Sequence, residues 1–123
     1  MLDGPPVRLK PDAGRAIGMA VHELSTNAVK YGALASERGR IRIEWFDGPA
    51  LVIRWTESGG PPITNPPVRE GFGRQVLVDM VEHELDAVVR LEYPTTGLIW
   101  EMTAPAQRIL DAPRFSLQTG RDQ

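Results

Sequence analysis

Residues 12–32 read DAGRAIGMAVHELSTNAVKYG and carry the clearest structural signal in this chain of 123 residues. Apolar side chains recur in this stretch every three or four residues, which is the repeat of one face of an α-helix. Asp12 is the expected N-cap and Gly32 the expected residue after the C-cap, so the pattern predicts a helix between them. The positions that share its apolar face are Ala13, Ile17, Ala20, Leu24, Ala28 and Tyr31.

Strand patterns lie on both sides of this helix. Before it, Val7 and Leu9 alternate with charged residues and predict a short strand at the edge of a sheet. After it, residues 41–45 and 51–55 alternate apolar and polar side chains on either side of Asp47-Gly48-Pro49. Alternation around such a turn is typical of a β-hairpin with one face on the core.

The second half of the chain continues this succession of elements. Residues 58–71 contain four prolines and three glycines and predict a long loop. A helix is expected from about Phe72, with strands at residues 88–93 and 98–103. Strands that occur mostly in hairpins, together with two long helices, predict an α+β fold. We expect a two-layer sandwich in which a mixed, mostly antiparallel sheet packs on helices.

Composition excludes several classes of protein. The chain has no cysteine, which excludes disulfides, thiolate nucleophiles and cysteine-bound metals. Its 14 basic and 16 acidic residues give a net charge of −2, which argues against nucleic acid or an anionic membrane as partner. No apolar run approaches the ~18 residues of a membrane span, and no signal peptide is evident. We therefore expect a cytoplasmic protein with one domain over residues 1–105 and a polar tail over residues 106–123.

Three polar residues of the first helix suggest a binding site. Glu23, Asn27 and Lys30 are spaced i, i+4 and i+7, so they lie in one strip beside the apolar face. Carboxylate and amide oxygens suit Mg²⁺, and an ammonium group suits a phosphate. Spacing alone favours the simpler alternative, which is a solvated helix face with a stabilising Glu–Lys pair.

Two glycine-rich segments suggest the rest of such a site. Glu57 follows a predicted strand, where a carboxylate can accept a hydrogen bond from an exocyclic amine, and Gly59 and Gly60 would let a flat ring approach the backbone. Gly71-Phe72-Gly73-Arg74 precedes the second helix, a common position for anion binding. Each segment is also typical of ordinary turns, and Trp55 at the strand end is more typical of a core than of a ligand contact.

In their order and in the residues that they contain, these segments resemble the ATP-binding catalytic domain of histidine kinases, within the GHKL (Bergerat-fold) superfamily. More narrowly, they resemble the HWE subfamily, because His22 stands in the N-box and Trp55-Thr56-Glu57 stands in the G1 box. The resemblance runs from about Gly4 to Pro105, and its most specific part is HELSTNAVKYGAL, which begins at His22.

The resemblance implies a site for ATP and Mg²⁺. It implies that Asn27 coordinates Mg²⁺ and that Glu23 holds the position of the metal-ordering or general-base acid. It also implies that Lys30 and Tyr31 border the phosphates and the nucleotide, and that Glu57 reads the adenine amine. The further nucleotide-binding positions that it implies are Gly59, Gly60, Gly71, Phe72, Gly73 and Arg74, with residues 61–70 as a short lid.

The implied function is the catalytic part of a bacterial two-component sensor kinase. It would present the γ-phosphate of Mg-ATP to a histidine on a separate dimerisation domain, in cis or in trans, and would act indirectly on a response regulator receiver domain. Arg74 and Gln75 stand where similar sequences carry a small hydroxyl residue and a basic one, and no helix pair with an acceptor histidine is present. The alternatives are a catalytically impaired GHKL nucleotide-binding or docking module and an anti-sigma-type serine kinase, which Trp55-Thr56-Glu57 disfavours.

Overall fold

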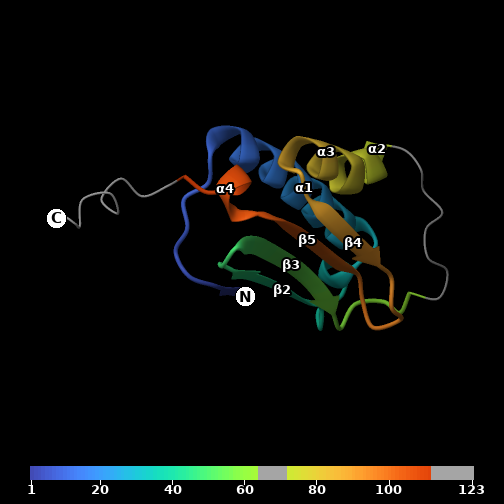
Figure 1. Cartoon of the computed structure of the whole chain (residues 1–123). Helices are drawn as coiled ribbons and strands as arrows, with labels where there is room; N and C mark the ends of the chain where they lie inside the picture. Colours follow the sequence, from blue (N-terminus) through green and yellow to red (C-terminus); the bar gives the residue numbers. More distant parts are fainter. Residues whose placement is uncertain (64–71, 112–123) are drawn as a thin grey trace.

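The structure, a computed structural model, describes residues 1–63 and 72–111. Their strands form one five-stranded sheet in the order β1-β2-β3-β5-β4 (Figure 1). Neighbouring strands are antiparallel except for β1 and β2, which are parallel, so the sheet is mixed as predicted. The strands are β1 (Leu2–Asp3), β2 (Arg40–Phe46), β3 (Ala50–Ser58), β4 (Val88–Glu92) and β5 (Ile99–Pro105).

Helices cover one face of this sheet, which confirms the predicted two-layer α+β sandwich (Figure 1). The longest is α1, which contains most of the stretch 12–32 that predicted a helix. None of the helices in the described part of the chain is long and apolar enough to cross a membrane. The helical segments are α1 (Pro11–Lys30), η1 (Ala33–Ala35), α2 (Phe72–Arg74), the π-helical η2 (Gln75–Met80), α3 (Val81–Leu85) and α4 (Ala106–Ile109).

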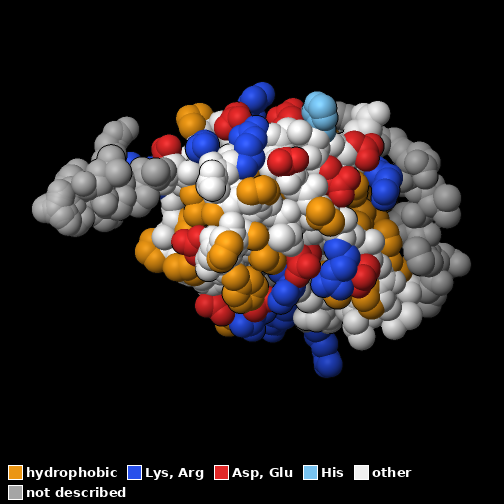
Figure 2. Space-filling model, in the orientation of Figure 1, with side chains coloured by type: hydrophobic (Ala, Val, Ile, Leu, Met, Phe, Trp, Pro, Cys, Tyr) orange, Lys and Arg blue, Asp and Glu red, His pale blue; other side chains and the backbone are white. Residues whose placement is uncertain are grey.

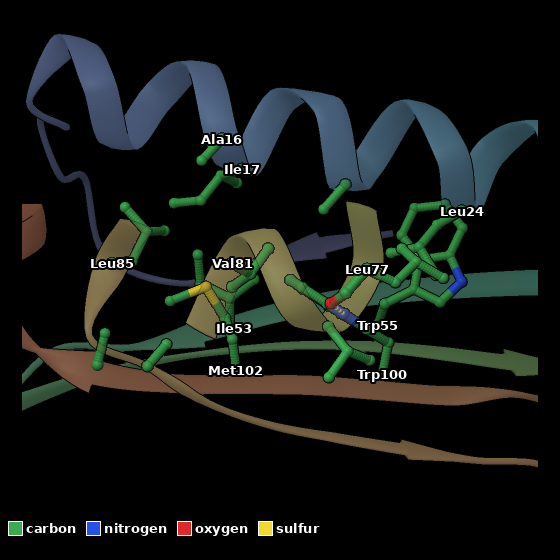
Figure 3. Close-up of a cluster of buried hydrophobic side chains, with 14 of the residues drawn as sticks. Ala16, Ile17, Leu24, Ile53, Trp55, Leu77, Val81, Leu85, Trp100 and Met102 are labelled. Carbon is green, nitrogen blue, oxygen red and sulfur yellow. Dashed lines mark hydrogen bonds between the residues drawn. The ribbon is translucent and has the colours of Figure 1, made fainter. Parts of the chain in front are cut away.

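The core lies between α1, the segments η2 and α3, and the two central strands (Figure 3). Small residues such as Ala16, Ala20 and Ala28 bring α1 close to its neighbours, and Leu24 fills the space beneath its C-terminal half. Alternate residues of β3 and β5 meet this stripe, because successive strand residues point to opposite faces. The side chains that these strands bury are Leu51, Ile53, Trp55, Trp100, Met102 and Ala104, together with Glu57.

The second predicted helix is a continuous run of α2, η2 and α3. Its apolar residues Val76, Leu77 and Val81 are buried, and Met80 packs against the core from a half-buried position. The Trp100 indole N–H donates to the Leu77 carbonyl at 2.8 Å, a bond drawn as a dashed line in Figure 3. This hydrogen bond satisfies the buried indole donor and joins the π-helical segment to β5.

The two ends of the chain differ from the sequence-based expectation. The edge strand is β1, whereas Val7 lies outside any strand and Leu9 makes only an isolated bridge to Leu110. The polar tail expected from residue 106 begins with α4, whose Ile109 is fully buried. Residues 106–111 therefore pack with the domain, because α4 closes the core beside the start of α1.

The start of α1 also differs in detail. The helix begins at Pro11 with Lys10 as its N-cap, so the prediction that Asp12 is the N-cap was wrong. Proline suits the first helical position because its missing N–H has no partner there in any case. The Asp12 side chain instead accepts from the Ala13 N–H and pairs with Arg108 of α4 at 3.1 Å. The hydrogen bond with Arg108 lowers the pKa of the Asp12 carboxyl.

The sheet face away from the helices carries charges that pair with one another. Glu101 of β5 contacts Arg54 of β3 at 2.7 Å and Arg90 of β4 at 3.6 Å. Arg54 also reaches Glu44 of β2 at 3.7 Å. Figure 2 shows acidic and basic side chains interspersed over the face in view. The charges of these strands therefore satisfy one another on this face.

Candidate functional site

The first group of predicted site residues lies on the C-terminal half of α1. Glu23 and Asn27 are half-buried and Lys30 is exposed, as expected for a strip at the edge of the core. Among the residues that the structure describes, neither Glu23 nor Lys30 forms an ion pair, and no hydrogen bond engages the Asn27 side chain. The Glu–Lys pair of the simpler alternative is therefore not formed within residues 1–63 and 72–111.

Glu23 of α1 lies against the glycine segment that precedes the second predicted helix. A Cβ atom built on Gly73 would lie 2.8 Å from Glu23 Oε2, so this carboxylate rests against the backbone at the start of the second helical run. A side chain at position 73 would displace the end of this carboxylate. Arg74 beside it is exposed. Two segments that are 50 residues apart in sequence (23 and 73) thus lie together.

Three parts of the predicted site fall wholly or partly outside the described residues. Gly71 lies outside them, and so does the predicted lid over residues 61–70, apart from residues 61–63. Phe72 begins α2, and nothing is described of its side chain. The predicted roles of these positions stay predictions.

Glu57 is buried at the end of β3, with 5% of its surface exposed. Its Oε1 accepts a hydrogen bond from the Ala33 backbone N–H at 2.9 Å, and its Oε2 accepts one from the Trp55 indole N–H at 2.9 Å. A buried carboxylate is costly unless such donors satisfy it. The first bond joins the end of β3 to η1, directly after α1, so Glu57 lies at the same end of α1 as Asn27 and Lys30.

Glycines around Glu57 allow these segments to pack against each other. A Cβ on Gly32 would overlap Glu57 Oε1, and a Cβ on Gly60 would lie 2.8 Å from the Ala33 Cα. Gly59 has φ +74° and its Cβ position is taken by the Arg38 carbonyl. Packing within the chain is thus a sufficient reason for Gly59 and Gly60, and their predicted contact with a flat ring stays a prediction.

Gly32 has a double role. Its amide donates to the Ala28 carbonyl at 3.1 Å, so it follows the C-cap Tyr31 as predicted. Its lack of a side chain also leaves room for the Glu57 carboxylate. Tyr31 itself is 59% exposed, so its predicted place on the apolar face of the helix was wrong. Its predicted place at the border of the nucleotide site stays a prediction.

The sequence reasoning missed two donors that define the surroundings of Glu57. The Ala33 amide gave no sequence signal, because its role depends on how η1 packs. The Trp55 indole did give a sequence signal. Residues i and i+2 of a strand point to the same face, so the side chains of Trp55 and Glu57 are expected to lie side by side. Trp55 is 3% exposed and therefore is a core residue, as its position at a strand end favoured.

The donor set restricts the metals that could bind here. In the described ranges, no three side chains of His, Cys, Asp or Glu gather as a metal site would need. Asn27 and Glu23 offer two oxygen ligands at neighbouring turns of one helix. Mg²⁺ commonly takes one or two protein oxygens and completes its octahedron with water and substrate phosphates. The residues present therefore fit a Mg²⁺ ion that is also coordinated by the phosphates of a bound ligand.

Comparisons with known proteins point to one family. The chain is 37% identical over 109 residues to a blue-light-activated histidine kinase of Brucella ovis, and 37% identical over 110 residues to blue-light-activated histidine kinase 1 of Erythrobacter litoralis. Each match covers 85% of this chain but only 22% and 30% of the two relatives. The chain thus spans less than a third of the length of these proteins. No family model matches it.

Solved structures agree with the sequence comparison. The histidine kinase domain of the Erythrobacter litoralis blue-light-activated kinase EL346 superimposes with a TM-score of 0.69 at 20% identity, over 87% of this chain and 52% of that one. The catalytic domain of histidine kinase ThkA gives a TM-score of 0.60 at 19% identity, over 85% of this chain and 76% of that one. This chain is therefore related in sequence to the histidine kinases, and it has the GHKL-type α+β fold of their catalytic domains.

Proposed function

We propose that this chain is the ATP-binding catalytic domain of a histidine kinase and that it presents the γ-phosphate of Mg-ATP to a histidine on a separate dimerisation domain. The contact between Glu23 and the backbone of Gly73 carries this proposal. It brings together the acidic residue of the first helix and the glycine segment of the second, which are the two places where the sequence suggested metal and phosphate binding. The same site has Asn27 one turn further along α1.

The side chains of this site fall into metal ligands and phosphate-binding cations. Asn27 and Glu23 supply oxygens for Mg²⁺, and bound Mg²⁺ would neutralise phosphate charge. Lys30 and Arg74 are exposed cations suited to phosphate oxygens. The proposal assigns none of these side chains the role of a nucleophile, which suits phosphoryl transfer, where the protein mainly positions the groups and neutralises charge. Membership of the HWE subfamily and a cytoplasmic location stay predictions from the sequence.

Partners follow from the same proposal. One solved structure of similar fold is histidine kinase ThkA in complex with the response regulator protein TrrA, with a TM-score of 0.59 at 21% identity over 85% of this chain. We propose that this chain likewise acts upstream of a receiver domain, through a phosphohistidine carried by another domain.

The chain alone is expected to bind ATP without phosphorylating a histidine of its own. Transfer needs an acceptor nitrogen close to the γ-phosphate and nearly in line with the leaving oxygen. His22 points about 80–140° away from Glu23, Asn27 and Lys30 around α1. His83 lies about 15 Å along the second helical run from Gly73. Incubation of the purified chain with γ-labelled ATP should leave no acid-labile label.

Addition of a histidine-bearing dimerisation domain from a related kinase should then produce the label on that domain. Its His→Ala variant is the matched control and should stay unlabelled. ATP binding without transfer to any acceptor domain would instead favour the impaired nucleotide-binding module, to which Arg74 and Gln75 point. Label on His22 or His83 of the isolated chain contradicts the assigned geometry, and label on serine of a protein substrate favours the serine kinase alternative.

Glu57 is expected to make the site prefer adenine. A carboxylate accepts from the amino group of adenine but repels the carbonyl oxygen that guanine presents at the same ring position. Wild-type protein should therefore bind ATP at least about tenfold more tightly than GTP in calorimetric titrations. Equal affinities for the two nucleotides would rule out this role.

Replacement of Glu57 by glutamine extends the test. Both carboxylate oxygens of Glu57 face N–H donors, so either orientation of a glutamine amide would set its NH₂ group against another donor. Glu57→Gln should lower the free energy of unfolding by about 1–3 kcal/mol and reduce the preference for ATP over GTP. Melting curves measured beside the titrations separate the two effects.

A further inference from the structure

The Trp55 indole N–H has a role that packing alone does not require. The ring is buried in the core cluster that Figure 3 shows. Its indole N–H nevertheless donates to Glu57 Oε2 at 2.9 Å. An apolar side chain could occupy this core position without any donor. The nitrogen therefore serves the carboxylate rather than the core.

The two donors act on Glu57 together. The Ala33 N–H holds Oε1 and the Trp55 N–H holds Oε2, so rotation of the carboxylate about its terminal bond would break both bonds. Each carboxylate oxygen can accept two hydrogen bonds, so one acceptor position remains on each. The carboxylate is thus held in one orientation and can only accept from a ligand.

The position of the pair explains why orientation matters. Gly32 lies against Oε1, and the backbone of Gly97 packs against the Glu57 carbonyl, so the surrounding chain leaves little freedom at this residue. Trp55 is the member of this group whose donor comes from a side chain and can be removed by substitution. Its indole N–H contacts the acid.

We propose that Trp55 is a positioning residue for nucleotide selection: its indole N–H orients the Glu57 carboxylate so that it accepts from the exocyclic amino group of an adenine nucleotide. This inference rests on the proposed function, because it assumes that an adenine nucleotide binds beside Glu57. It adds a reason for the spacing of Trp55 and Glu57, which places donor and acceptor on one face of β3.

The experiment compares ATP with purine riboside triphosphate, which lacks only the exocyclic amino group. Wild-type protein should bind ATP about tenfold more tightly than the purine analogue, as expected for one hydrogen bond to a charged group. Trp55→Phe keeps an aromatic ring in the core and removes the donor. It should lower the affinity for ATP toward that for the analogue, so that the ratio of the two affinities falls to about two or less.

A matched control tests whether loss of any indole N–H has this effect. Trp45 donates to the Pro5 carbonyl and lies on β2 four residues from Ile41, the partner of Glu57 across the sheet. This is about 13 Å along the strand. Trp45→Phe should leave the ratio of affinities at the wild-type value. A purely structural role for Trp55 would weaken both nucleotides equally and leave the ratio unchanged, which would overturn the inference.

A spectroscopic readout makes the outcome independent of stability. The chain has three tryptophans, so its three indole N–H resonances can be assigned with Trp45→Phe, Trp55→Phe and Trp100→Phe. ATP should shift the Trp55 resonance more than the purine analogue does, because the amino group acts on the shared carboxylate. An unmoved Trp55 resonance in ATP-bound protein contradicts the inference alone, whereas wild-type protein that binds no ATP contradicts the proposed function and the inference with it.

Discussion

Asn27→Ala is expected to lower the affinity for Mg-ATP by at least about a hundredfold while the fold stays intact. The Asn27 side chain lies at the edge of the core and forms no hydrogen bond within the described residues, so its loss leaves no buried group without a partner. Alanine also has the higher helix propensity, which predicts an unchanged or slightly raised melting temperature. Calorimetric titration with ATP and Mg²⁺, together with a melting curve, measures both quantities.

The neighbouring residue provides the control for this variant. Thr26 lies on the same turn of α1, and its hydroxyl donates to the His22 carbonyl at 2.9 Å. Thr26→Ala should therefore change helix stability slightly and leave the affinity for Mg-ATP near the wild-type value. Asn27→Ala protein that binds Mg-ATP as tightly as wild type would remove Asn27 from the metal site.

Gly39→Ala is expected to lower the free energy of unfolding by about 3 kcal/mol. A Cβ atom at this position would overlap the carbonyl oxygen of Ala33, and a backbone group cannot swing aside as a flexible side chain does. Either η1 or the start of β2 must move. For a domain of this size the melting temperature should fall by roughly 10 °C.

Gly18→Ala is the matched control, because the chemical change is the same and the surroundings differ. Gly18 is exposed in the middle of α1, and beyond its own stretch of helix no described atom lies within 4 Å of its Cβ position. Alanine there should raise the free energy of unfolding by about 0.5–1 kcal/mol through its helix propensity. If the two variants melt at the same temperature, the close contact between Gly39 and Ala33 is not present in the protein.

Local patterns in the sequence were enough to predict most of the fold. The spacing of Ala13, Ile17, Ala20, Leu24 and Ala28 predicted the buried face of α1, and the alternation around residues 47–49 predicted the β2–β3 hairpin. These features depend on the repeat of apolar side chains along a single element. The residues of that element alone determine this repeat. Prediction failed where the position of an element depended on a distant partner. β1 pairs with β2, whose paired residues lie 41 positions further along the chain, and α4 with its buried Ile109 packs against β3 and β5.

The candidate site shows the same division. Spacing placed Glu23, Asn27 and Lys30 on one strip of α1, and the order of the motifs indicated which other segments to expect beside it. The packing of the folded chain decided three other contacts. The Glu23 carboxylate rests on Gly73, the Ala33 N–H donates to Glu57, and the missing side chain of Gly39 leaves room for the Ala33 carbonyl. Glu57 and Ala33 are 24 residues apart, and contacts of this range depend on how helices settle on the sheet, which no local repeat records.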